Sequence, residues 1–234
     1  MKKLVKIVIA AVLCLGFMTT AVMAEDESYV EIASYTETFV PNGIDGELTT
    51  TVKETAGSDG YIYLIKTVAN AEVVSVEGTN IVAELEEWGQ GSVKYLRAKV
   101  VDPTQEATLT AVLNCPEFYK ENLVADTNGG NTNSISYTFK NYFSNAIGKY
   151  ALTIYTPKGN DIVKVTTPNK YANFKLGEKD EMLSVSVSGK VAVNGSSAIA
   201  YTYNPAATGL TKGLVWVICL AIGAFVFIDR YKKA

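Results

Sequence analysis

The stretch ELEEW holds the residues with the clearest capacity for chemistry: Glu84, Glu86, Glu87 and Trp88. Two carboxyl groups beside an aromatic ring are what a glycoside hydrolase needs. On an extended strand, alternate residues share a face, so Glu84 and Glu86 lie together in a pattern more typical of a solvated surface. We therefore predict no catalytic residue. Trp88, Glu86 and Glu87 are retained as a candidate ligand-binding site, with a carboxylate-based wall hydrolase as an alternative.

A second candidate is the polar stretch DTNGGNTNS, in which Asp126, Asn128 and Asn131 offer oxygen atoms. Such oxygens bind Ca²⁺, but an EF-hand loop ends in a bidentate glutamate at its twelfth position. Counted from Asp126, that position is Tyr137. The same asparagines and glycines are the residues that a turn requires. The stretch predicts a polar turn and no cofactor, with Ca²⁺ held by Asp126, Asn128 and Asn131 as the alternative.

The residue types that are scarce restrict the chemistry further. Histidine is absent, which removes Ser-His-Asp catalysis, Cys-His catalysis and the usual zinc sites. Of three cysteines, Cys14 and Cys219 lie in apolar terminal stretches, so Cys115 has no intrachain disulfide partner in the central region. Residues 25–208 carry 14 basic and 23 acidic residues, a net charge of −9, which disfavours a nucleic-acid partner. The sequence therefore favours a protein that is not an enzyme.

The elements that must position these residues are short strands. Runs rich in Val, Ile, Thr and Tyr alternate with turns that contain Gly, Asn, Asp and Pro. This pattern predicts antiparallel β-sandwiches. The runs are YIYLIKTV, SVKYLRAKVV, ATLTAVL, SISYTFKNY, YALTIYT, DIVKVTT, MLSVSVSGKVAV and AIAYTY.

When the sequence is aligned with itself at an offset of 89 residues, one part of the chain matches another. This alignment places Thr49 on Thr138 and Tyr61 on Tyr150, and gives eight identities in the 41 positions from Asp45 to Leu85. We interpret this echo as an internal duplication. The alternative is that any two β-rich stretches align at some shift. The succession of strand, Asn- or Glu-containing turn and strand resembles bacterial immunoglobulin-like repeats.

The predicted fold is all-β, with two tandem immunoglobulin-like antiparallel β-sandwiches at residues 25–120 and 135–204, joined by a linker at 121–134. A signal peptide is expected at 1–24, because basic residues, an apolar stretch and AVMA follow one another. A stalk at 205–212 leads to a transmembrane helix at 213–228 and a cytoplasmic tail at 229–234. For residues 1–24 the alternative is an uncleaved signal anchor, and for residues 213–228 it is a buried core helix.

The prediction that the protein is anchored in a membrane rests on its C-terminal stretch. Residues 213–228 have no charge and would span about 24 Å as a helix. Aromatic rings favour the membrane interface, and basic residues favour its cytoplasmic side. The expected anchor residues are Trp216, Arg230, Lys232 and Lys233.

Together these features predict a single-pass protein of the cell membrane, with its bulk outside the cytoplasm and its C-terminus inside. We expect a structural or protein-interaction module of a bacterial cell envelope. Its partners would be membrane lipid, through the C-terminal helix, and other envelope proteins or further copies of itself. The alternative is a glycan-binding or adhesive surface module that uses Trp88 and exposed tyrosines.

Overall fold

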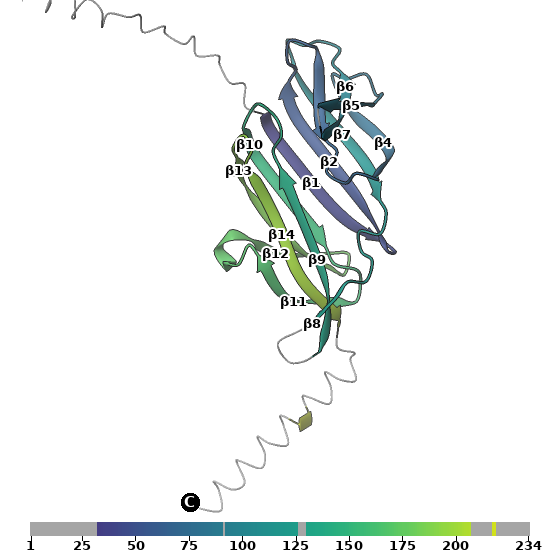
Figure 1. Cartoon of the computed structure of the whole chain (residues 1–234), viewed down its shortest axis with the longest axis vertical. Coiled ribbons are helices and arrows are strands. Elements are labelled where there is room, and N and C mark those ends of the chain that lie inside the picture. The colour runs from purple at the N-terminus through teal and green to yellow at the C-terminus, as the bar shows by residue number, and fades with distance from the viewer. Residues whose placement is uncertain (1–31, 91, 126–129, 207–216, 219–234) are drawn as a thin grey trace, which may run out of the picture. The chain divides into compact units, whose positions relative to one another are not determined.

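The computed structural model describes residues 32–90, 92–125, 130–206 and 217–218 (Figure 1). In these residues, helical geometry is confined to a 3-10 turn at Tyr171–Asn173 and to Val217 and Ile218. The prediction of an all-β fold is confirmed. The predicted signal peptide, the stalk after residue 206, the terminal helix except residues 217–218, and the tail lie outside the described residues. Within the part that is described, no helix is long and apolar enough to cross a membrane.

All eight runs singled out in the sequence form strands. The first half of the chain holds β1 (Ile32–Asn42), β2 (Asp45–Thr55), β3 (Tyr61–Ile65), β4 (Glu72–Thr79), β5 (Glu86–Gln90), β6 (Val93–Lys99) and β7 (Glu106–Cys115). The second half holds β8 (Leu123–Ala125), β9 (Asn131–Lys140), β10 (Ile147–Tyr155), β11 (Asn160–Thr167), β12 (Lys175–Lys179), β13 (Met182–Val191) and β14 (Ser196–Pro205).

Three sheets form two layers. One layer is a seven-stranded sheet in the order β12-β13-β10-β1-β2-β7-β4. A three-stranded sheet, β3-β6-β5, and a four-stranded sheet, β11-β14-β9-β8, cover the same face of it. Tyr35 on β1 shows this arrangement, because its hydroxyl accepts a hydrogen bond from the Ile65 backbone N–H of β3 at 3.1 Å, while its ring centroid lies 5.1 Å from that of Phe139 on β9.

The two halves of the chain arrange their strands in the same order. The order β4-β7-β2-β1 in the first half matches β11-β14-β9-β8 in the second, and β3-β6-β5 matches β10-β13-β12. An irregularity between Val73 and Ser75 of β4 recurs between Ile162 and Lys164 of β11, which is 89 residues later. The halves are joined by a parallel pairing of β1 with β10, which makes the seven-stranded sheet continuous.

The strand order differs from that of an immunoglobulin constant domain. There the fifth strand belongs to the four-stranded sheet, and the seventh to the three-stranded sheet. Here β5 pairs with β6 in the three-stranded sheet, and β7 lies between β2 and β4. A period-two pattern tells which side chains face inward, but it does not tell which sheet a strand joins. The sandwich architecture therefore agrees with the prediction, while this connectivity departs from it.

The core lies between the layers. On β7, every second residue from Ala107 to Cys115 is buried, and the residues between them are less so. Burial raises the pKa of the Cys115 thiol to about 12, so this cysteine packs as a small apolar group. The opposite face of the large sheet carries hydroxyl side chains, such as Thr51 and Thr110, whose oxygens lie 3.0 Å apart.

Gly78 on β4 lies where no side chain fits. A Cβ atom there would lie 2.0 Å from the backbone oxygen of Thr108 and 2.8 Å from Cδ1 of Ile81. Because the nearest atom belongs to the backbone of β7, the strands must move apart to make room. We expect Gly78→Ala to lower the free energy of unfolding by about 2 kcal/mol, measured by urea denaturation. Gly189→Ala on β13 is the control, since no atom lies within 4 Å of its added Cβ. Equal stability of the two variants would contradict the prediction.

Candidate functional site

The candidate residues of ELEEW lie on the edge strand β5 of the three-stranded sheet. Glu86 is paired with Arg97 of β6, and Arg97 is paired with Tyr63 of β3. In the next row, Trp88 is paired with Tyr95. Residues directly opposite each other on antiparallel strands point to the same face. The pairing therefore collects an aromatic–arginine cluster on one face of this sheet, made up of Tyr61, Tyr63, Glu86, Trp88, Tyr95 and Arg97.

Arg97 is the centre of this aromatic–arginine cluster. Its Nε and Nη2 donate to Oε2 of Glu86 at 3.1 and 3.0 Å. Its guanidinium carbon lies 4.2 Å from the ring centroid of Tyr61 and 5.9 Å from that of Trp88. The hydrogen bond with Tyr63, and to a smaller extent the hydrogen bond with Glu86, raises the pKa of Arg97. The cation is thus engaged by groups of its own sheet.

The aromatic rings of the cluster are tilted against one another. The plane of Tyr63 makes angles of 63° with Trp88 and 83° with Tyr95. Trp88 and Tyr95 are inclined by 52° at a centroid separation of 5.5 Å. Edge-to-face contacts of this kind stabilise the packing of the rings with each other. The rings form a half-buried cluster that holds the strands together, and they do not form a flat platform.

Glu86 and Glu87 point to opposite faces of β5. Glu87 is paired in register with the buried Leu96, and its carboxylate forms an ion pair with Lys66, whose side chain is only 8% exposed. The hydrogen bond and charge of Lys66 hold the pKa of Glu87 below its usual value. Each carboxylate therefore has its own cation, and the structure does not bring the two together as an acid–base pair.

Trp88 is expected to matter chiefly for stability. Because its ring contacts Tyr63 and Tyr95, Trp88→Ala should lower the free energy of unfolding by about 2 kcal/mol. The measurement is urea denaturation followed by circular dichroism, which does not depend on tryptophan fluorescence. Trp88→Phe keeps an aromatic ring and should lose less than half as much. An unchanged midpoint for Trp88→Ala would contradict this assignment.

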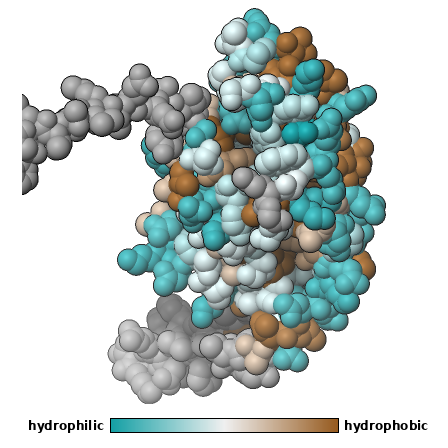
Figure 2. Space-filling model, turned by 45° about the horizontal axis from the view of Figure 1, so that its top comes forward, coloured by the Kyte–Doolittle hydropathy of each residue, from teal (hydrophilic) through white to brown (hydrophobic). Residues whose placement is uncertain are grey.

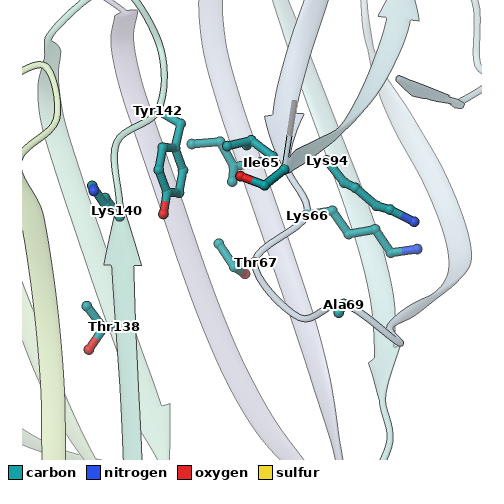
Figure 3. Close-up of a pocket in the computed structure, with 10 residues that line it drawn as sticks. Ile65, Lys66, Thr67, Ala69, Lys94, Thr138, Lys140 and Tyr142 are labelled. Carbon is teal, nitrogen blue, oxygen red and sulfur yellow. The ribbon is translucent and has the colours of Figure 1, made fainter. Parts of the chain in front are cut away.

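A cavity of about 350 Å³ lies where the three-stranded sheet meets the four-stranded sheet (Figure 3). Its wall includes Lys66, Thr67, Lys94, Thr138, Lys140 and Tyr142. In Figure 3 the phenol end of Tyr142 points into the space on the side of Thr67 and Thr138. The ammonium groups of Lys66 and Lys94 lie together, away from that of Lys140. The three lysines do not converge on one point, so the cavity lacks the arrangement of an anion site.

A buried carboxyl group, Glu37 of β1, lies behind the wall of this cavity. This residue is only 1% exposed. The hydroxyl of Tyr150 donates to Oε2 at 2.6 Å, and the hydroxyl of Tyr137 lies 2.8 Å from Oε1 and 2.7 Å from the hydroxyl oxygen of Thr67. Burial raises the pKa of Glu37 to about 7, although both tyrosine hydrogen bonds oppose the shift. This network joins β1 to β9 and β10, and therefore connects the two halves of the chain.

Glu37, Tyr137 and Tyr150 were not predicted from the sequence as functional residues. A signal was present, because Glu37 stands two residues from Tyr35 and two from Phe39, which are both buried. A charged residue at a core-facing position of an alternating run indicates a buried polar group with partners. It does not tell which partners those are.

The remaining predicted site residues fall mostly outside the described residues. Asp126 and Asn128 do so, while Asn131 begins β9, is exposed and is paired with Ala125. In the described ranges, no group of three or more His, Cys, Asp or Glu residues could hold a metal ion. The predicted anchor residues Trp216, Arg230, Lys232 and Lys233 also lie outside the described residues.

Comparisons with known proteins add little. No family model matches the chain, and no curated protein matches it. Among solved structures, the crystal structure of an M1 zinc metallopeptidase from Deinococcus radiodurans matches with 11% identity and a TM-score of 0.40. The match covers 74% of this chain and 42% of the peptidase chain, so this chain spans less than half of that protein. A likeness at this level carries no conclusion about fold or activity.

Proposed function

We propose that this chain is a membrane-tethered protein of the bacterial cell envelope, located outside the cytoplasm, which serves as a structural or protein-interaction module and not as a catalyst. Its body would consist of two tandem β-sandwich repeats derived from one ancestral unit. The single observation that carries the proposal is the parallel pairing of β1 with β10, which runs from Ile32 opposite Ile147 to Phe39 opposite Ile154.

The pairing supports a structural role because it removes the hinge that tandem domains usually have. Residues 32–206 belong to one compact unit, and the buried core is continuous across both halves. A motion between the halves would have to break the β1–β10 ladder and the hydrogen bonds from Tyr137 and Tyr150 to Glu37. A body that stays rigid is suited to hold a partner at a fixed position near a membrane.

The duplication part of the proposal is supported by topology. Equivalent strand orders and an equivalent irregularity in β4 and β11 are expected if the halves descend from one repeat. The start of β5 at Glu86 and of β12 at Lys175 lies at the 89-residue shift found in the sequence. The merger of the repeats would then have arisen when the first strand of one repeat paired with the third strand of the next.

The candidate site gives no support to the alternative functions. Glu86 and Glu87 face opposite ways and are neutralised separately, which disfavours a hydrolase. The rings around Trp88 are inclined to each other and half-buried, which disfavours stacking on a sugar.

The experiment that tests the proposal uses the full-length chain in intact bacteria. In-cell crosslinking followed by mass spectrometry should recover envelope proteins or further copies of the chain. External protease should reach the body of the protein, and alkaline carbonate should leave it in the membrane. A matched chain that ends at Ala206 should be released. Extraction of the full-length chain by carbonate, or an absence of any crosslinked protein, would contradict the proposal.

A further inference from the structure

The seven-stranded sheet ends in two edge strands, β4 and β12, which lie on opposite sides of the molecule (Figure 1). Among the described residues, each is hydrogen-bonded to a strand on one side only, β7 for β4 and β13 for β12. All five residues of β12 are exposed, as are seven of the eight residues of β4. An edge of this kind is a template on which another strand can pair.

The two edges carry opposite charges on the same face of the sheet. Glu72 and Glu77 of β4 are paired with Asn114 and Thr110 of β7. Lys175 and Lys179 of β12 are paired with Ser186 and Met182 of β13. Thr110, Asn114 and Ser186 belong to the outer, hydroxyl-bearing face, so all four charged side chains are on that face. None of the four has an ion-pair partner within the described part of the chain.

The spacings of these charges agree. Lys175 and Lys179 are four residues apart. Glu72 and Glu77 are five apart, but the irregularity between Val73 and Ser75 inserts one extra residue. The partners of the two glutamates on β7 are therefore four residues apart, like the two lysines. Both pairs of opposite charges can thus be in register at the same time.

The strand directions fix the way in which two copies would meet. Traced through the sheet, β12 runs parallel to β1, whereas β4 runs antiparallel to it. A second copy that continues the sheet without being turned over, and that is rotated as the twist of the sheet requires, would therefore set its β12 antiparallel to β4. Glu77 would face Lys175 of the second copy, and Glu72 would face its Lys179. On the other face Val76 would face Leu176, which is 51% exposed in the single chain.

Other pairings of the edges are disfavoured by charge. Two β4 strands would place glutamates against glutamates, and two β12 strands would place lysines against lysines. Like charges directly opposite each other on neighbouring strands are destabilising. On the face in view in Figure 2, hydrophobic residues lie in separate patches between hydrophilic ones. Charge repulsion therefore disfavours pairing between two β4 edges or between two β12 edges, whereas the charges of β4 and β12 are complementary.

We infer that copies of this chain join edge to edge, β4 of one copy pairing with β12 of the next, to form a row that continues the seven-stranded sheet. Such a head-to-tail contact leaves one edge free at each end of the row, so the row can grow at both ends unless the rotation between copies closes it into a ring. The inference rests on the proposed function and names the partner as a second copy of this chain.

The test exchanges the charges of the edges in the full-length chain, purified in detergent and reconstituted into vesicles. Wild type should give a concentration-dependent series of multimers. Glu72→Lys with Glu77→Lys makes both edges basic, and Lys175→Glu with Lys179→Glu makes both acidic. Each variant alone should need at least about tenfold more protein to assemble, and an equimolar mixture of the two should assemble like wild type. Unchanged circular dichroism and melting midpoints serve as the folding control, since the four residues are exposed.

A disulfide experiment checks the register. Glu77→Cys and Lys175→Cys are combined in one chain in a Cys14→Ser, Cys219→Ser background, where the remaining Cys115 is buried. Mild oxidation should give a ladder of dimers, trimers and longer products. The control combines Glu77→Cys with Lys179→Cys, which shifts one partner by about 13 Å along the strand, and should give no ladder.

Three outcomes would overturn the inference: a wild-type chain that stays monomeric in vesicles, a mixture that does not restore assembly, or a control ladder as strong as the designed one. If the full-length chain in cells then crosslinks to other envelope proteins but never to itself, the inference fails while the proposed function stands. If it crosslinks to nothing, both fail.

Discussion

Tyr35→Ala should lower the free energy of unfolding by about 4 kcal/mol, because it removes a large ring that is fully buried at the junction of three sheets. The ring lies 5.1 Å from Phe139, 6.0 Å from Phe143 and 6.3 Å from Tyr150, all measured between centroids. These partners belong to the second half of the chain. The truncation would also leave the backbone N–H of Ile65 without its acceptor.

Tyr35→Phe is the matched control. It keeps the ring contacts and removes only the hydroxyl, so the loss should be about 1–2 kcal/mol. Urea denaturation followed by circular dichroism gives both values. Because Tyr35 packs against both halves, each variant should unfold in a single transition, with both halves lost together. Two separate transitions, or equal losses for the two variants, would contradict the structural role described for Tyr35.

Glu37 should make the protein less stable as the pH rises from about 4.5 to about 7. The folded state raises the pKa of this carboxyl group to about 7, from a reference value of 4.5 in the unfolded chain. Between these values the folded state holds a proton that the unfolded state has lost. The stabilising contribution is therefore complete below the unfolded pKa and disappears as the pH approaches the folded pKa. The expected size is about 3 kcal/mol.

Glu37→Gln is the variant that isolates this effect. Glutamine keeps the size of the side chain and does not titrate, so wild type should lose stability relative to the variant across the stated interval. Part of the pH dependence should persist in the variant, because burial also raises the pKa of Glu54 to about 7. Adding Glu54→Gln should remove this second part. A constant difference between wild type and Glu37→Gln over the interval would contradict the assignment.

Local sequence patterns predicted the strands well where apolar and polar residues alternate. The runs that became β7 and β10 are of this kind, and each buries every second residue over much of its length. β1 was missed, because Glu37 occupies an inward position between Tyr35 and Phe39 and disrupts the alternation. β4 and β12 were missed because they are edge strands with almost no buried side chain.

For the candidate site, the sequence identified Glu86, Glu87 and Trp88 as residues worth testing, but it could not give their partners. Arg97 is paired with Glu86 through the β5–β6 hairpin, whereas Lys66 reaches Glu87 from beyond the end of β3. Neither contact could be predicted from the spacing of these residues along the sequence, because strand register decides which side chains are neighbours across a sheet. The tilt of the rings around Trp88, which decides against a flat stacking surface, depends on packing in the same way.

By itself the sequence determined that the chain is all-β, which segments form most of the strands, and that catalysis by histidine or a disulfide-linked core is not available to it. These properties depend on residue type and on the two-residue period of a strand, which are local. Only the tertiary structure decided that β1 pairs with β10, whose first residues are 115 positions apart. It also decided that Glu37 is buried under two tyrosines from the other half, and that complementary charges lie at the two edges of one sheet. The reason is physical: a backbone strand can pair with any other strand, and long-range packing of side chains selects which one.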